Sequence, residues 1–216
     1  MNEAATGGGC AVLIPAFDEE RRVAAVIEVA LAADRGPVLV VDDGSSDATA
    51  QMAREAGAHV HRLEVNVGKG AALFAGARQL DAEVVVLLDA DLVGLTPEHV
   101  RMLADPVLDG SCDMTRGVFA GARLATSVAQ RLAPALGGQR GLRREALASV
   151  DGIEQARFGI EILLESAARR GSWRTCDVNL RGVGQVMKEE KRGWRAGVRA
   201  RLAMYSDIVR AMLRRS

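Results

Sequence analysis

Apolar and polar residues alternate in blocks along the first half of the chain. Short runs of consecutive apolar residues are typical of strands that are buried on both faces of a sheet. Such strands are expected at residues 11–14, 38–41, 59–63 and 84–88, with helices between them at 20–33, 47–56 and 69–80. Strands that alternate with helices predict right-handed βαβ units. The predicted fold is α/β: one domain with a mostly parallel central sheet flanked by helices.

The second half of the chain is less regular. A helix is expected to start at Thr96, with Thr96 as N-cap and Pro97 in the first position. Further predicted elements are a strand at 114–119, a helix at 157–170 that ends before Gly171, and a strand at 173–183. We divide the chain into a flexible N-terminus (1–9), two functional halves (10–95 and 96–190) and a C-terminal helix (191–216).

That C-terminal helix is basic and amphipathic. Residues 181–216 contain ten Lys or Arg and three Asp or Glu, and apolar residues recur at helical spacing between 194 and 212. Two interpretations stay open. The helix packs on the domain or on a second copy of the chain as a homodimer contact, or it lies on a membrane surface as a peripheral anchor.

The remaining composition favours a soluble globular protein. The chain has 216 residues, 49% of them hydrophobic, and its 28 basic and 28 acidic side chains balance. This balance argues against a nucleic-acid partner. The three cysteines match no zinc spacing, and we expect them to be reduced core thiols. With no signal peptide or membrane-spanning run expected, the predicted location is cytoplasmic, with a peripheral place at the inner face of the membrane left open.

Candidate chemistry gathers where the predicted strands end. The strand at 84–88 leads into Asp89-Ala90-Asp91, and residues i and i+2 of an extended segment point the same way. Both carboxylates can therefore face one hard divalent cation. The alternative is a turn with two solvated aspartates. The other exits are also acidic, at 18–20 and 42–47, and ligands of open α/β sheets bind at the carboxyl ends of the strands.

A positive group is expected beside these acids. Asn66-Val67-Gly68-Lys69-Gly70 leads into a helix and offers backbone N–H groups, small residues and one ammonium, which suit a phosphate. The spacing of a Walker A loop is absent. The plain alternative is a glycine-rich helix start with a solvated lysine.

Four segments, taken in order, resemble the family 2 glycosyltransferases of the GT-A fold. They are residues 14–20 (Ile-Pro-Ala-Phe-Asp-Glu-Glu), 41–49 (Val-Asp-Asp-Gly-Ser-Ser-Asp-Ala-Thr), 66–70 and 89–92. Beyond residue 95 the chain is similar to glucosyl-3-phosphoglycerate synthases and to small polyprenyl- or dolichol-phosphate sugar transferases. That similarity rests on 136–140, on Phe158-Gly159-Ile160-Glu161 and on 178–183.

The resemblance implies a role for each matching residue. The nucleotide-sugar donor would contact Pro15, Ala16, Phe17, Glu19, Asp42, Asp43, Gly44, Lys69, Asp89 and Ala90. Either Asp42 or Asp43 would read the nucleobase, and Lys69 would meet the diphosphate. The acceptor would contact Gly138, Gln139 and Arg140. The catalytic residues would be Asp91, Glu161 and Lys69, and Mg²⁺ or Mn²⁺ would bind Asp89, Asp91 and Gln185.

The metal site departs from the pattern at one position. The synthases carry a histidine ligand just after the last core strand, where this chain has Gly184-Gln185. An amide oxygen suits a hard cation but is a weaker ligand than imidazole for Mn²⁺.

The resemblance implies metal-assisted transfer of a sugar from a UDP- or GDP-sugar. The second half supplies Arg116, Arg123, Arg140, Arg143, Arg144 and Arg181. Because guanidinium groups match phosphate oxygens, we expect an anionic acceptor, phosphoglycerate-like or a polyprenyl phosphate, with Arg140 as its main contact. A non-catalytic nucleotide-sugar-binding homologue and a sugar nucleotidyltransferase are the alternatives.

Overall fold

The centre of the fold is a seven-stranded sheet whose strands come from both halves of the described chain. In the computed structural model, which describes residues 5–6, 9–119, 138–157 and 159–185, the strand order is β10-β8-β9-β6-β2-β3-β4. Every neighbouring pair is parallel except the two that involve β9, so one strand runs against six. Because both halves of the chain contribute strands to this sheet, they share one framework, and the predicted α/β class with a mostly parallel sheet is confirmed.

The bounds of the elements are as follows. The strands are β1 (Ala5–Thr6), β2 (Cys10–Ala16), β3 (Val38–Asp42), β4 (His59–Arg62), β5 (Leu80–Asp81), β6 (Val84–Leu87), β7 (Leu92–Val93), β8 (Met114–Phe119), β9 (Arg140–Arg143), β10 (Thr175–Leu180) and β11 (Gly184–Gln185). The helices are α1 (Val23–Ala32), α2 (Thr49–Glu55), α3 (Lys69–Gln79), α4 (Pro97–Leu108), α6 (Arg144–Ala148) and α7 (Ile160–Arg170).

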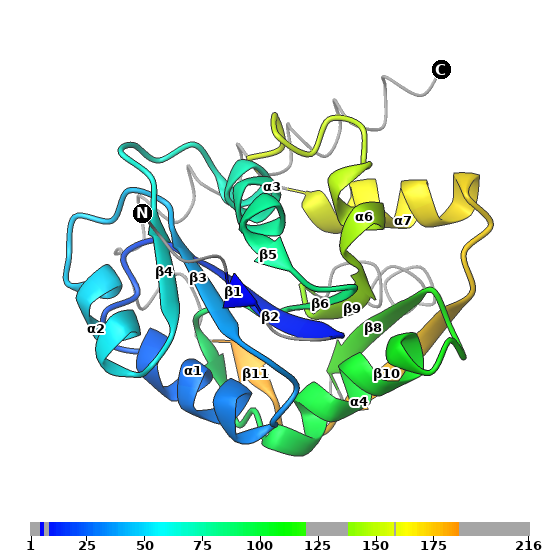
Figure 1. The fold of residues 1–216 in the computed structure, drawn as a ribbon, viewed down its shortest axis with the longest axis horizontal. Coiled ribbons are helices and arrows are strands. Elements are labelled where there is room, and N and C mark those ends of the chain that lie inside the picture. The colour runs from blue at the N-terminus through cyan, green and yellow to red at the C-terminus, as the bar shows by residue number, and fades with distance from the viewer. Residues whose placement is uncertain (1–4, 7–8, 120–137, 158, 186–216) are drawn as a thin grey trace, which may run out of the picture.

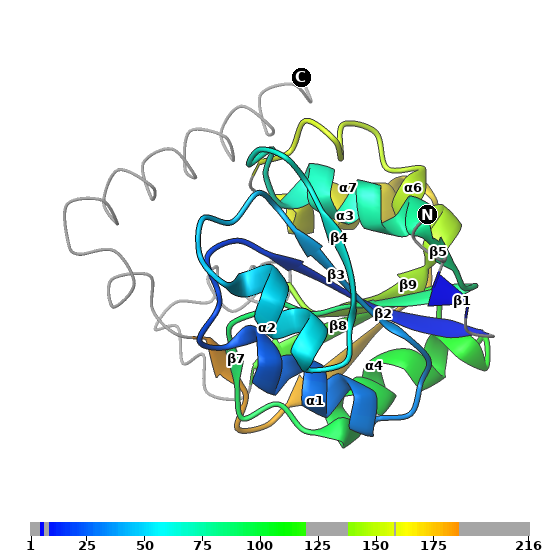
Figure 2. The same ribbon diagram turned by 60° about the vertical axis from the view of Figure 1, so that its left-hand side comes forward.

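Two helical layers cover the sheet. In Figure 1, α3, α6 and α7 lie on one face and α1, α2 and α4 on the other, and the same layering is visible in the turned view of Figure 2. Alternate residues of the central strands enter separate cores: Val12 and Val86 pack with α1 and α4, while Leu13 and Val85 pack with α3 and α7. Because the strands are apolar on both faces, they require cover on both sides.

The antiparallel strand β9 was not predicted. Its sequence, Arg-Gly-Leu-Arg, is short, and Gly141 lies where a Cβ would approach the carbonyl oxygen of Leu103 to 2.1 Å. In the register, Arg140 lies opposite Leu87, the last residue of β6. The start of β9 therefore reaches the edge where the parallel strands end, and it brings residues 138–139 to that edge.

Most predicted elements are confirmed, with shifts at some ends. Strand β8 has the expected bounds, and α4 starts as predicted: the Thr96 hydroxyl accepts from the His99 N–H, and Pro97 is the first helical residue. Helix α1 begins three residues later than expected because Glu19 to Arg22 forms a turn. Helix α7 likewise begins at Ile160 rather than at 157.

A small two-stranded sheet lies beside the main one. Strands β7 and β11 pair antiparallel, with Gln185 opposite Leu92 and Gly184 opposite Val93. Leu92 directly follows Asp91, so the chain that leaves β10 returns to the exit of β6.

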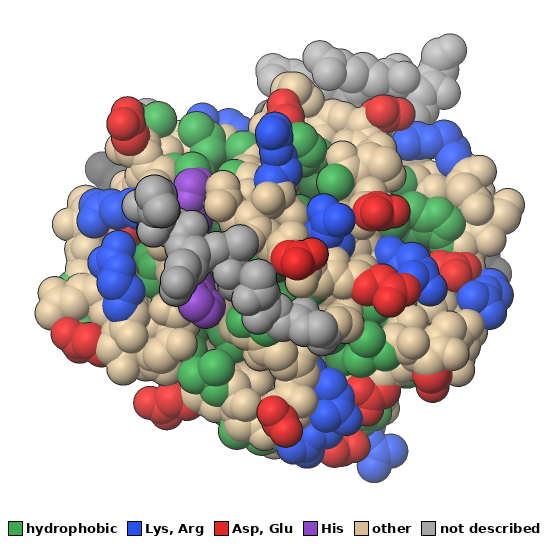
Figure 3. Space-filling view, in the orientation of Figure 1, with side chains coloured by type: hydrophobic (Ala, Val, Ile, Leu, Met, Phe, Trp, Pro, Cys, Tyr) green, Lys and Arg blue, Asp and Glu red, His purple; other side chains and the backbone are tan. Residues whose placement is uncertain are grey.

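Several predictions fall outside the described residues. These are the C-terminal helix at 191–216, Arg123, and most of the N-terminal segment 1–9. Within the described part of the chain, no helix is long and apolar enough to cross a membrane. On the face in Figure 3, basic and acidic side chains are interspersed. The three cysteines are free thiols, and Cys10 and Cys112 are buried, as expected for core residues.

Candidate active site

Asp89 is the centre of a polar junction at the exit of β6. One carboxylate oxygen lies 2.8 Å from the Lys69 ammonium, and the other accepts a hydrogen bond of 2.9 Å from the side-chain amide of Gln139. Lys69 also lies 2.7 Å from a carboxylate oxygen of Glu161. Four side chains from four segments of the chain thus meet at one point, as the predicted convergence at this edge requires.

The Lys69 ammonium bridges the carboxylates of Asp89, at the end of the sheet strand β6, and Glu161, on helix α7. Lys69 is the first residue of α3, while Glu161 is in the first turn of α7, where the helix dipole favours a negative charge. Burial alone would lower the pKa of Lys69, but the carboxylates of Asp89 and Glu161 outweigh it and raise this pKa well above its ordinary value. Lys69 is therefore a fixed positive charge at neutral pH.

Gly138 and Gln139 come from the segment that precedes β9. A Cβ on Gly138 would lie 2.5 Å from a carboxylate oxygen of Asp89 and 2.9 Å from the Lys69 nitrogen, so only glycine fits there. Gln139 is fully buried. Both were predicted as acceptor contacts, and their positions against Asp89 follow from the reversed direction of β9.

Asp91 lies two residues further along the same exit. It is half-buried, while Ala90 between the two aspartates is buried in the core beside α1 and α4. The pairing of β11 with β7 places the backbone of Gln185 opposite Leu92, next to Asp91.

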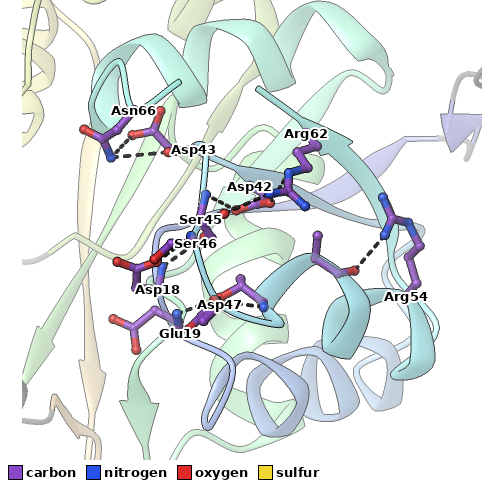
Figure 4. A network of polar contacts seen from close by, with 12 residues as sticks. Asp18, Glu19, Asp42, Asp43, Ser45, Ser46, Asp47, Arg54, Arg62 and Asn66 are labelled. Atoms are coloured by element: carbon purple, nitrogen blue, oxygen red, sulfur yellow. Dashed lines mark hydrogen bonds and ion pairs between the residues drawn. The ribbon is translucent and has the colours of Figure 1, made fainter. Parts of the chain in front are cut away.

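At the exit of β3, backbone N–H groups rather than charged side chains bind the Asp43 carboxylate. Asp43 accepts from the backbone N–H groups of Val67 (2.8 Å) and Gly68 (2.9 Å) and from the Asn66 amide (3.0 Å). Figure 4 shows Asp43 and Asn66 facing each other. Burial raises the pKa of the Asp43 carboxyl, although these N–H donors act to lower it.

These contacts correct the expectation for the loop before α3. We expected its backbone N–H groups to be free for a phosphate, but two of them bind Asp43 and the Gly70 N–H binds the Ala156 carbonyl at 2.9 Å. The protein's own carboxylate occupies the place of the anion. The Lys69 ammonium is the part of this motif that reaches the junction at Asp89.

Asp42 points away from Asp43, toward Arg62 (Figure 4). It is fully buried, accepts from the Ser45 N–H at 3.1 Å and lies 3.3 Å from the Arg62 guanidinium. A side chain in this position has a structural role and is closed to a nucleobase. Of the two aspartates that the sequence left open, only Asp43 faces the loop beside the junction.

The exits of β2 and β3 are joined by reciprocal hydrogen bonds. Asp18, which has a left-handed backbone (φ 53°), donates its N–H to the Ser45 hydroxyl and accepts from the Ser46 N–H at 2.9 Å. A second pair of contacts continues this connection, from the Glu20 N–H to Asp47 (3.2 Å) and from the Ala48 N–H to Glu20 (3.0 Å). Glu20 therefore supports the start of α2, although it precedes α1 in the sequence.

Asp47 lies one residue before the N-cap of α2 and accepts a hydrogen bond from the start of the helix. Ala48 is the N-cap by its backbone angles, but the Asp47 carboxylate accepts from the Thr49 N–H at 2.9 Å. Burial acts to raise the pKa of Asp47, and the hydrogen bonds from Thr49 and Glu20 outweigh it, so this pKa is lower than usual.

The residues predicted to contact the nucleotide lie along the hydrogen-bonded exits of β2 and β3. Pro15, Phe17, Glu19 and Gly44 follow one another around the exits of β2 and β3, and the Asp43 N–H donates to the Ala16 carbonyl at 2.8 Å. The Ala16 side chain is buried, so its contribution to a ligand would come from the backbone. A Cβ on Gly44 would lie 2.6 Å from the backbone of Val65, which explains the need for glycine at that turn.

Arg140 is not the exposed acceptor contact that we expected. Its side chain is fully buried and its guanidinium lies 2.9 Å from Glu165, which also pairs with Arg116 at 3.2 Å. A guanidinium that is buried and paired in this way is closed to a ligand phosphate, and removal of its partner would leave an uncompensated buried charge. Arg143 pairs with Glu83, and Arg144 donates to the Ala82 carbonyl at 3.0 Å. Arg181 is exposed and directly follows β10.

Sequence reasoning missed three residues that hold this site together. Asp18 and Ser45 connect the exits of β2 and β3. Arg157 donates to the Asn66 side chain at 2.9 Å and thereby supports the loop that Asp43 holds. The acidic and hydroxyl residues at 18 and 45 were a readable signal, whereas nothing in the sequence near Arg157 pointed to residue 66.

The donor set at the exit of β6 suits a hard divalent cation. Asp89 and Asp91 offer carboxylate oxygens, and Mg²⁺ is commonly bound by one or two carboxylates together with substrate phosphates. Among the described residues, no three His, Cys, Asp or Glu side chains form a complete metal cluster. The fit is therefore to a cation whose remaining ligands come from a bound diphosphate.

Parts of this chain are similar in sequence to known proteins. An undecaprenyl-phosphate 4-deoxy-4-formamido-L-arabinose transferase of Pectobacterium carotovorum is 36% identical over 110 residues, covering 46% of this chain and 33% of the transferase. A glucosyl-3-phosphoglycerate synthase of Mycolicibacterium paratuberculosis is 28% identical over 218 residues, covering 83% of this chain and 66% of the synthase. The chain thus spans a third to two thirds of these relatives.

Solved structures show the same fold. A crystal structure of the glucosyl-3-phosphoglycerate synthase of Mycobacterium tuberculosis with Mn²⁺, UDP and glucosyl-3-phosphoglycerate has a TM-score of 0.66 at 27% identity, covering 86% of this chain and 74% of that one. Its complex with Mn²⁺ and UDP-glucose has a TM-score of 0.68 at 26% identity, covering 94% and 80%. The sequence pattern of glycosyl transferase family 2 matches residues 11–156. The chain belongs to glycosyl transferase family 2.

Proposed function

We propose that this chain is a metal-assisted glycosyltransferase that moves a sugar from a UDP- or GDP-sugar to a phosphorylated acceptor. The observation that carries the proposal is the junction of Lys69, Asp89, Gln139 and Glu161 at the carboxyl edge of the sheet. It gathers the two carboxylates and one ammonium that the family resemblance assigns to the donor and the acceptor.

The nucleotide pocket is assigned to the joined exits of β2 and β3. Pro15, Phe17 and Glu19 would line the base and ribose, and Asp43 would read the base. Two features support this assignment. The rim is pinned by hydrogen bonds between the two exits, so a ligand meets a preformed surface. The loop bound to Asp43 leads directly to Lys69, which would contact the diphosphate.

The metal is assigned to Asp89 and Asp91. The resemblance adds Gln185, whose backbone lies in β11 and whose side chain is outside the described part of the structure. When bound, Mg²⁺ or Mn²⁺ neutralises the diphosphate that leaves as the anomeric bond breaks. Lys69 adds a permanent positive charge beside Asp89 and helps to stabilise the same leaving group. The Gln139 amide fixes the orientation of Asp89.

The acceptor is assigned to the space beside Glu161 and the turn after β10. Glu161 would orient or deprotonate an acceptor hydroxyl, and an acceptor that is already an anion needs only cationic contacts. We assign to Arg181 the contact with an anionic acceptor that was expected of Arg140, because Arg181 is exposed. The turn that contains Arg181 packs on the turn that follows Asp91, where Gly94 approaches Gly182.

The names of the relatives support a phosphorylated acceptor. One relative is named for undecaprenyl phosphate, and a solved neighbour contains phosphoglyceric acid. Both acceptors are therefore included in the test of the proposal.

The proposal is tested with a panel of UDP- and GDP-sugars, Mg²⁺ or Mn²⁺, and either phosphoglyceric acid or a polyprenyl phosphate. We expect release of UDP or GDP that requires metal and acceptor. Asp91→Ala should lower this release by about 100- to 1000-fold, because it removes a metal ligand. The matched control is Asp151→Ala, an exposed aspartate of which 95% of the side-chain surface is accessible.

Other outcomes separate the alternatives. Nucleotide-sugar binding without any transfer would identify a binding homologue. Formation of a sugar nucleotide from a nucleoside triphosphate and a sugar phosphate would identify a nucleotidyltransferase. Full activity in Asp91→Ala would disprove the metal assignment.

A further inference from the structure

The side-chain carbonyl of Gln139 is a buried acceptor without a donor. Gln139 is fully buried, and its Oε1 atom has no hydrogen-bond partner among the residues that the structure describes, whereas its Nε2 atom donates to Asp89. Leaving a buried acceptor unpaired typically costs about 1–3 kcal/mol. Native proteins contain few such groups, and one beside reactive side chains calls for an explanation.

The orientation of this amide is fixed by chemistry. A carboxylate only accepts hydrogen bonds, so the Gln139 atom 2.9 Å from Asp89 must be the nitrogen. The other oxygen of Asp89 lies 2.8 Å from the Lys69 ammonium, which is also a donor, so both oxygens of this carboxylate act as acceptors. The oxygen therefore faces away from Asp89, and exchanging the two atoms cannot satisfy it.

The backbone of Gln139 is also held in place. Its carbonyl accepts from the Gly117 N–H at 2.8 Å, and a Cβ on Gly117 would lie 3.0 Å from the Gln139 Cβ. On the other side, Gly138 packs against Asp89 and Lys69. The side chain is thus set between β8 and the junction, with little freedom to turn toward another donor.

We propose that the Gln139 Oε1 atom accepts a hydrogen bond from a substrate hydroxyl and makes this residue a determinant of substrate specificity. The inference rests on the proposed function, because it places the hydroxyl on the sugar of the donor or on the acceptor. Either source presents the same chemistry, an alcohol O–H close to Asp89 and Glu161.

The consequence is selectivity against substrates that lack this hydroxyl. A site built to bind a hydroxyl rejects an analogue without it, because the buried protein group then stays unpaired. Fluorine has nearly the size of a hydroxyl but cannot donate. Replacing the correct hydroxyl by fluorine should therefore weaken binding on the order of 10- to 100-fold.

The experiment measures binding by calorimetry in the presence of Mn²⁺. In the donor arm, UDP-glucose or GDP-mannose, whichever binds, is compared with analogues in which one sugar hydroxyl at a time is replaced by fluorine. In the acceptor arm, phosphoglyceric acid is compared with its counterpart that lacks the free hydroxyl, with UDP or GDP present. We expect one position, in one arm, to show the loss in the wild-type protein.

Three variants connect that loss to Gln139. Gln139→Met has nearly the same volume but no acceptor, and its affinities for the parent and the fluorinated compound should agree within about twofold. Gln139→Glu keeps an oxygen acceptor and should still discriminate, even if all ligands bind more weakly. Gln51→Met, on the exposed surface of α2, should behave like wild type. Thermal unfolding confirms that each variant is folded.

The outcomes are distinct. No discrimination at any position in the wild-type protein, or equal discrimination in Gln139→Met, would overturn the inference while leaving the proposed function intact. Absence of binding by every sugar nucleotide would overturn the proposed function, and the inference with it.

Discussion

The exits of β3 and β6 each carry two acidic side chains, but these side chains have different partners. At β3, Asp43 binds two backbone N–H groups and Asp42 lies buried against Arg62. At β6, Asp89 is held by the side chains of Lys69 and Gln139. Backbone donors are fixed by the fold, whereas side-chain donors can move when a ligand arrives. Similar acidic motifs are therefore held rigidly by backbone groups at one exit and by side chains that can rearrange around a ligand at the other.

The strongest test of this difference is Asp89→Asn. We expect sugar transfer to fall on the order of 1000-fold, because the variant loses a charge at the reacting diphosphate. The free energy of unfolding should change by less than about 1 kcal/mol, since Lys69 keeps its contact with Glu161. Turnover and chemical denaturation are measured on the same preparation, with Asp105→Asn, an aspartate in a surface pair with Arg35, as the control.

Asp43→Ala should lose stability as well as nucleotide binding. It leaves the N–H groups of Val67 and Gly68 without the carboxylate, while the Asn66 amide keeps its contact with the carbonyl of residue 43, and we expect a loss of about 2–4 kcal/mol in the free energy of unfolding. Denaturant unfolding checks this value. A variant as stable as wild type would show that the β3 exit is less rigid than its hydrogen bonds indicate.

Asp47→Asn tests the joined exits by pH. Because hydrogen bonds lower the pKa of Asp47 in the folded state, its stabilisation is present above the ordinary aspartate pKa, about 3.9, and is lost as the pH falls through the lower folded value. At neutral pH we expect the variant to be less stable by about 1 kcal/mol. The difference between variant and wild type should shrink below about pH 3.9, and a difference independent of pH would contradict this role.

Arg181→Gln should have the smallest effect, and it extends the comparison to the exit of β10. We expect the KM for a phosphorylated acceptor to rise roughly fivefold, with kcat nearly unchanged, because one exposed charge-assisted contact is lost. Added salt should reduce the difference. Arg143→Gln, which removes a surface pair with Glu83 instead, is the matched control.

The sheet was predictable from the sequence because its central strands are continuous apolar runs. Strands β2, β3 and β6 follow directly from these runs, and the acidic exits were located correctly. Strand β9 was not predictable, because a four-residue segment with two arginines and a glycine has no strand pattern and is stabilised by its neighbours.

The same missed strand explains the error at Arg140. Without β9, nothing indicated that Arg140 would lie inside the domain opposite Glu165, a residue 25 positions away on α7. Motifs found Lys69, Asp89 and Glu161, but they could not show which partners the two buried aspartates, Asp42 and Asp43, would have. Those partners include Arg62 and Asn66, which come from later elements.

The reversed direction of β9 has a consequence for the geometry of the junction. Strand β8 ends, and β9 begins, at the same edge of the sheet, as the pairing of Arg116 with Arg140 shows. Gln139, the residue before β9, therefore lies where β6 ends and donates to Asp89. A parallel strand in the same place would begin at the opposite edge and would carry Gln139 away from Asp89.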